Sequence, residues 1–85
     1  MKYEDIEKVI NKQITKHPTV QITFKTRSAI KGIFIQTPDY QELSRKNLWR
    51  IVVERHIDSY KETRDENLAK IFNGTEFTRL EVVTK

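Results

Sequence analysis

The side chains of this chain that are best placed to bind another molecule are three lysines near its beginning. Lys8, Lys12 and Lys16 follow Glu4 at intervals of four residues, which places all four on one face of a helix. Lysine ammonium groups bind phosphates as point charges, so this face would suit a polyanion such as nucleic acid. An ordinary solvated helix face has the same pattern, and the spacing leaves both interpretations open.

Positive charge is concentrated in the first third of the chain. The formal net charge is +4, with seven basic and three acidic residues in positions 1–32 and nine of each in positions 33–85. No acid occurs between Glu7 and Asp39, an interval that holds six basic side chains, the last of which is Lys31. This asymmetry favours a polyanionic partner, although a soluble protein with ordinary surface lysines would also have it.

Residue combinations suited to catalysis are scarce. His17 and His56 fall on different predicted elements, and the chain has no cysteine, Gly-rich phosphate loop, Ser-centred elbow or HExxH motif. Glu54, His56 and Asp58 would share one face of a strand and could ligate a metal, but a charged, solvent-facing strand is the simpler interpretation. We therefore expect a protein that is not an enzyme and that uses no metal or cofactor.

A helix over about residues 3–16 would carry the lysines. The helix should have an apolar face that packs on the sheet, because apolar residues recur at intervals of three and four, namely Tyr3, Ile6, Val9, Ile10 and Ile14. The helix should end at Pro18, because the residue before a proline avoids the α conformation.

Five short strands are expected over the remainder, between about residues 19 and 83. Alternation predicts strands over about residues 20–25, 29–36 and 49–57, with Gly32 marking a bend or a close backbone approach in the second. The last two strands meet at Asn73-Gly74, a pair that supplies the positive φ angles of a tight turn. Residues 39–47 are predicted to form a loop, and residues 58–67 an exposed connection or a hairpin end.

Length and hydropathy limit the class of protein. Eighty-five residues are enough for a single domain with a small core, which we expect to span residues 1–85. No apolar run approaches the roughly 18–20 residues of a membrane span. The first residues also lack the apolar core of a secretory signal, so no membrane association and a cytoplasmic location are expected.

The order of these elements resembles the Sm/LSm-like family, which includes bacterial Hfq. Residues 31–35, Lys-Gly-Ile-Phe-Ile, look like the first family motif, and residues 47–51, Asn-Leu-Trp-Arg-Ile, are similar to the Asn-Leu-x-Leu pattern that closes it. Residues 71–77, Ile-Phe-Asn-Gly-Thr-Glu-Phe, resemble the second motif. The resemblance implies a mainly β fold with an N-terminal helix, a strongly bent five-stranded antiparallel open barrel of Sm-like or SH3-like type.

The same resemblance implies single-stranded RNA as a partner, with bases held near Asn47, Asn73 and Gly74. Tyr40 is the aromatic residue available to stack on a base. Three departures from the family bear on this function. Asn73 stands where family members have an arginine, the segment 39–47 is longer than the usual loop, and the Tyr-Lys-His signature of Hfq is missing before the last turn.

Assembly into a homo-oligomer is also implied. Sm-like proteins form rings in which the fourth strand of one subunit pairs with the fifth strand of the next, and an open barrel leaves strand edges that must be protected or paired. Two functions remain open. The first is an RNA-binding module that uses Lys8, Lys12, Lys16, Lys31, Tyr40, Asn47, Asn73 and Gly74. The second is a non-enzymatic protein-interaction or scaffolding domain on the same fold, without nucleic-acid binding.

Overall fold

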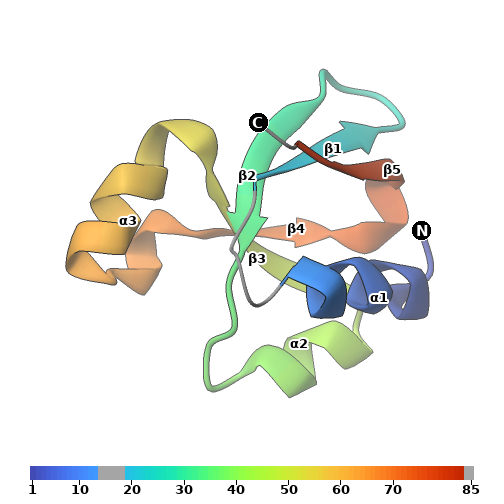
Figure 1. Cartoon of the computed structure of the whole chain (residues 1–85). Coiled ribbons are helices and arrows are strands. Elements are labelled where there is room, and N and C mark those ends of the chain that lie inside the picture. Colours follow the sequence, from blue (N-terminus) through green and yellow to red (C-terminus); the bar gives the residue numbers. More distant parts are fainter. Residues whose placement is uncertain (14–18, 84–85) are drawn as a thin grey trace.

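In the computed structural model, which describes residues 1–13 and 19–83, a helix precedes a five-stranded antiparallel sheet (Figure 1). The strands are β1 (Val20–Phe24), β2 (Ile30–Phe34), β3 (Leu48–Val53), β4 (Lys70–Asn73) and β5 (Phe77–Val82). The described helices are α1 (Tyr3–Gln13), α2 (Tyr40–Arg45) and α3 (Ile57–Thr63), with short 3-10 turns η1 (Glu54–His56), η2 (Glu66–Leu68) and η3 (Gly74–Glu76). None of these helices is long and apolar enough to cross a bilayer.

The sheet has the strand order β4-β3-β2-β1-β5, so β4 and β5 form its two edges. Within the described residues no pairing joins β4 to β5, and the sheet is therefore not closed. The predicted N-terminal helix and five antiparallel strands are confirmed.

Two apolar clusters cover the two faces of the sheet. The inner face, as we call the face that α1 covers, holds the buried residues Ile6, Ile10, Val20, Ile22, Phe24, Trp49, Ile51 and Phe77. The outer face is covered by α3, and its buried residues are Ile33, Ile35, Val52 and Ile57. Alternation explains this division, because successive side chains of a strand point to opposite faces, as Ile51 and Val52 do in β3.

Helix α1 buries its apolar stripe as predicted at Ile6 and Ile10, which are 0% and 4% exposed. Tyr3 differs from the prediction, because it is 42% exposed and lies outside the core. The predicted helix extended to residue 16, and its last part, with Ile14, lies outside the described residues.

The prediction of a loop over residues 39–47 is wrong, since this segment contains α2. Tyr40 packs on the inner-face cluster, and Ser44, four residues later, is buried and donates a hydrogen bond to the backbone oxygen of Gln41. Helix α2 thus has a buried side that is only one turn long. Most of its other residues are polar, namely Gln41, Glu42 and Arg45, which is why the segment was predicted to be a loop.

The predicted extension of the third strand to residue 57 is also wrong. Strand β3 ends at Val53, and the segment predicted as an exposed connection contains α3 and η2. Ile57 and Tyr60 are three residues apart and both pack on the outer-face cluster, so tertiary contact selects a helix here.

This correction separates the three side chains that we expected on one strand face. Glu54 and His56 belong to η1, whereas Asp58 lies in α3. The described residues contain no group of three or more histidine, aspartate or glutamate side chains placed to hold a metal ion.

The turn at Asn73-Gly74 does not use positive φ angles, contrary to the prediction. Asn73 has a φ of −87°, and Gly74 also has a negative φ and begins η3, which carries the chain from one edge strand to the other. Glycine is needed at this position because of a close approach. A Cβ atom on Gly74 would lie 2.1 Å from Oδ1 of Asn47 and 2.7 Å from Cδ1 of Ile6.

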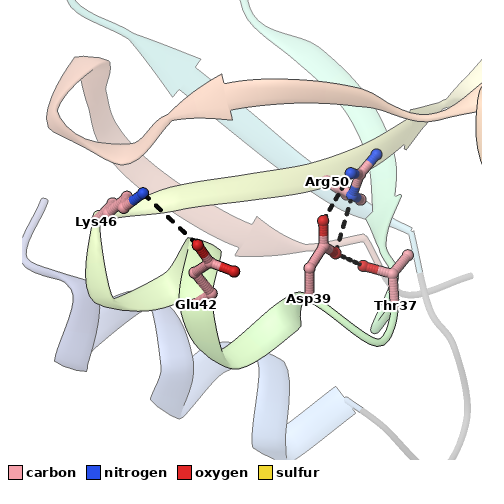
Figure 2. A network of polar contacts seen from close by, with 5 residues as sticks. All are labelled: Thr37, Asp39, Glu42, Lys46 and Arg50. Carbon is pink, nitrogen blue, oxygen red and sulfur yellow. Dashed lines mark hydrogen bonds and ion pairs between the residues drawn. The ribbon is translucent and has the colours of Figure 1, made fainter.

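A polar network fastens the beginning of α2 to β3 (Figure 2). Asp39 accepts hydrogen bonds from Nη2 of Arg50 at 2.9 Å and from Nε of the same residue at 3.3 Å. Its carboxylate also accepts a hydrogen bond from the hydroxyl group of Thr37. The hydrogen bond from Arg50 and the one from Thr37 lower the pKa of Asp39 from 3.8 to about 2.

We expect Asp39→Asn to reduce the loss of stability in acid. A carboxyl group with a lowered pKa in the folded state stabilises the fold above its unfolded pKa, and this contribution disappears as the pH falls from 3.8 to about 2. Urea unfolding measured across this pH interval should therefore show that the free energy of unfolding falls less steeply with decreasing pH for Asp39→Asn than for the wild type. Asp58→Asn, which changes an exposed carboxylate on α3, is the control and should keep the wild-type decline. Equal declines for the wild type and Asp39→Asn would contradict the expected role of the network.

Candidate nucleic-acid interface

A groove of about 450 Å3 opens where the β1–β2 turn, the end of β3 and strand β4 meet. We call it the basic groove, and its lining residues are Arg27, Ile30, Lys31, Val53, Glu54, Arg55, Lys70 and Phe72. These residues come from three stretches of sequence that strand pairing brings together. Gly32 of β2 lies opposite Val53, and Ile51 of β3 lies opposite Lys70.

The floor of the basic groove is apolar and its rim is cationic. Ile30, Val53 and Phe72 are partly buried, and Ile30 and Phe72 pack against the inner-face cluster. Four exposed basic residues also line the groove and form what we call its rim, namely Arg27, Lys31, Arg55 and Lys70. Glu54 is the single acid among the lining residues, so four positive charges and one negative charge leave a formal charge of +3.

The cations of the rim are not held in short ion pairs within the described part of the chain. None of the four lies 4.0 Å or less from a carboxylate oxygen there. Their charge is therefore available to an anion from solution. An apolar floor with a few charged groups at its edge is typical of sites that bind a ligand with both a planar or apolar part and a charged part.

Arg27 has a defined place in this groove, although it lies in a turn and is exposed. Its guanidinium carbon lies 5.0 Å from the ring centroid of Phe24 and 5.8 Å from that of Phe72, both within the range of a cation–π contact. The two rings are 5.9 Å apart, and Phe24 also meets Phe77 at 5.4 Å. A row of aromatic rings therefore extends from the core to the groove and supports Arg27.

Asn47 and Gly74, two residues that the sequence assigned to RNA binding, do lie together, but their contacts are internal. The side-chain amide of Asn47 donates a hydrogen bond to the backbone oxygen of Met1 at 2.9 Å and accepts one from Nε1 of Trp49 at 2.8 Å. The backbone NH of Gly74 donates a hydrogen bond to the backbone oxygen of Asn47 at 2.7 Å. The Met1 ammonium group donates to the backbone oxygens of Gly74 and Phe77. Both polar atoms of the Asn47 side chain are thus engaged within the protein.

Tyr40 is placed as a packing residue rather than as an open stacking surface. It lies on α2, partly buried, and its ring meets Trp49 at a centroid distance of 6.0 Å and an angle of 64°. Its hydroxyl oxygen is buried and has no hydrogen-bond partner in the described residues. Burial raises the pKa of Tyr40, and the nearby carboxylate of Glu7 raises it further, whereas the side chain of Gln36 acts in the opposite direction.

The other predicted site residues are dispersed. Asn73 is exposed, and its side-chain oxygen accepts hydrogen bonds from the backbone NH and the hydroxyl group of Thr75, which stabilises η3. Lys8 is exposed on α1, while the side chains of Lys12 and Lys16 lie outside the described residues. Among the predicted residues whose side chains the structure describes, Lys31 is the one that lines the basic groove.

Sequence reasoning did not identify the remaining cations of the groove or Phe72. The signal for β4 was present in its alternation, because Lys70 and Phe72 are two residues apart and must point to the same face. Their meeting with Arg27 and Arg55 depends on strand pairing, which the sequence pattern alone did not determine.

Comparisons of this chain with models of protein families, with curated proteins and with solved structures find no match. The function of the protein is therefore inferred from the chemistry of the groove.

Proposed function

We propose that this protein binds single-stranded RNA through the basic groove. The observation that carries the proposal is the placement of four cationic residues, none of them in an ion pair with another described residue, around an apolar floor. Lysine and arginine side chains neutralise phosphates and release their counterions, which makes binding favourable and dependent on salt. Unpaired bases can also reach an apolar surface, whereas the bases of a duplex are stacked and paired inside the helix.

We propose further that the sheet is a strongly bent open barrel of the Sm-like or SH3-like type and that copies of the chain associate through its edges. The strand order, with β4 and β5 as unpaired edges, supports this architecture. On β4, Ile71 is 48% exposed, and an exposed apolar side chain on an unpaired edge strand is consistent with an interface. An oligomer would carry several copies of the groove and so multiply a weak affinity for each.

The exposed Ile71 also favours a second function, namely protein interaction or scaffolding without nucleic acid. An edge strand can accept a strand from a different protein as well as from a second copy. This function uses the β4 edge and leaves the charge of the groove unused. Binding measurements on groove variants therefore distinguish the two.

The test is fluorescence anisotropy of short labelled U-rich and A-rich RNAs over about 20 to 200 mM salt. If four cations contact phosphates, the logarithm of the association constant plotted against the logarithm of the salt concentration should have a slope of about −3, since each phosphate of a single strand contributes about −0.7. The triple variant Lys31→Gln/Arg55→Gln/Lys70→Gln should bind more weakly and reduce the slope by about 2.

A matched control separates the groove from the net charge. Arg45→Gln/Lys46→Gln/Lys61→Gln removes the same charge from exposed positions that do not line the groove. This control should keep nearly the wild-type affinity and slope. Equal losses in the two triple variants, or no binding of the wild type even at low salt, would refute the proposed site.

A further inference from the structure

We infer that the basic groove contains a subsite for one unpaired base, which stacks on the surface formed by Phe72 and the Arg27 guanidinium while the phosphates on either side lie at the cationic rim. This inference rests on the proposed function and adds to it a specific contact. Its ligand is a nucleotide within a single strand, rather than a phosphate alone.

The position of Arg27 is the first argument. An arginine in an exposed turn normally extends into water, whereas this guanidinium lies over two phenylalanine rings, at 5.0 Å from Phe24 and 5.8 Å from Phe72. The residue nevertheless remains exposed and lines the groove. A planar group held in this way offers a stacking surface to a base, and its charge attracts the adjoining phosphate.

The floor is the second argument. A purely ionic ligand would contact only the rim and leave Phe72 and Ile30 in contact with water. A base is planar and largely apolar on its faces, so it would cover these side chains while the ribose and phosphate stay near the rim. The groove volume of about 450 Å3 lies within the range of small-ligand sites and is sufficient for a single nucleotide.

The charge pattern is the third argument, because it favours a nucleotide over an acidic peptide. Lys31, Arg55 and Lys70 lie on different strands or turns around one apolar floor. A strand of nucleic acid carries a phosphate on each side of every base and would meet such an arrangement at more than one point. A run of carboxylates such as poly-glutamate has no stacking group between its charges.

The experiment compares a base-bearing oligonucleotide with a fully abasic one of equal length and charge. Base stacking on an aromatic surface should make the base-bearing strand bind about 5- to 150-fold more tightly to the wild type. Phe72→Leu should remove most of this difference and leave the affinity for the abasic strand unchanged. Arg27→Lys keeps the charge but not the planar group, so it should lower the affinity for the base-bearing strand without changing the salt slope.

Phe34→Leu is the matched control for packing. Phe34 is also partly buried against the inner-face cluster, where it meets Trp49 edge-on at 6.2 Å, and it does not line the groove. It should lose stability comparably to Phe72→Leu and keep the full preference for the base-bearing strand. Arg27→Lys is made at an exposed position, so its result does not depend on a change in the core.

The outcomes distinguish this inference from the proposed function. If both strands bind the wild type with equal affinity, or if Phe34→Leu and Phe72→Leu reduce the preference equally, the base subsite is refuted while salt-dependent binding of RNA remains. If neither strand binds at low salt, the proposed function fails first. A further outcome is that poly-glutamate of equal charge displaces the base-bearing strand as readily as unlabelled RNA does. This result would show that the groove binds its ligands by charge alone, and it would also refute the subsite.

Discussion

Replacing Gly32 by alanine should destabilise the protein by about 3 kcal/mol, because the added methyl group collides with backbone that cannot move freely. A Cβ atom at this position would lie 2.6 Å from the carbonyl oxygen of Val52 and 2.9 Å from Cγ2 of Ile51. Gly32 pairs with Val20 on one side and with Val53 on the other, so relief of the collision would disturb both pairings. Urea unfolding followed by circular dichroism should show a much lower midpoint.

The neighbouring substitution Lys31→Ala is the control for stability. Lys31 lies in the same strand but is exposed, so its loss should change the free energy of unfolding by no more than about 0.5 kcal/mol. A midpoint for Gly32→Ala equal to that of Lys31→Ala would mean that β2 and β3 do not approach each other as closely as described. The sequence indicated either a bend or a close backbone approach at this glycine, and the fold has the close approach.

The strands could be predicted because their pattern is local. In β1, Val20, Ile22 and Phe24 alternate with polar residues, and the same three side chains are buried in the fold. Helices α2 and α3 could not be predicted in this way, because they have six and seven residues and only one buried turn each. What selects them is contact with distant residues, such as the ring of Trp49 for Tyr40.

The candidate site was predictable only in part, for a similar reason. The absence of acids between Glu7 and Asp39 indicated Lys31 as a candidate phosphate-binding residue, and charge requires no knowledge of the fold. Arg55 and Phe72 join Lys31 only through the pairing of three strands. The role of the Asn47 amide could not be predicted for a different reason. A side-chain amide can recognise a base or complete an internal hydrogen-bond network, and only the folded surroundings of the residue decide between these two roles.

Asn47→Ala should therefore act on folding and cost about 2–4 kcal/mol. The substitution leaves Nε1 of Trp49, a residue only 1% exposed, without its acceptor, and it leaves the backbone oxygen of Met1 without its donor. It also places alanine at a φ of 59°, in the left-handed region that asparagine and glycine tolerate better. Urea unfolding measures the loss, and Asn67→Ala, at an exposed asparagine of η2, should be nearly neutral.

Two further variants separate the causes of this loss. Asn47→Gly keeps the left-handed backbone accessible but removes the amide, so it should recover about 1 kcal/mol relative to alanine. Asn47→Asp keeps an acceptor for Trp49 but places a carboxylate oxygen against the backbone oxygen of Met1, so it should recover less stability than Asn47→Gly. If Asn47→Ala instead unfolds at the wild-type midpoint and loses affinity for RNA, the amide serves recognition rather than the fold. The expected result is the reverse, a less stable protein whose folded fraction binds RNA like the wild type, because the basic groove contains no atom of Asn47.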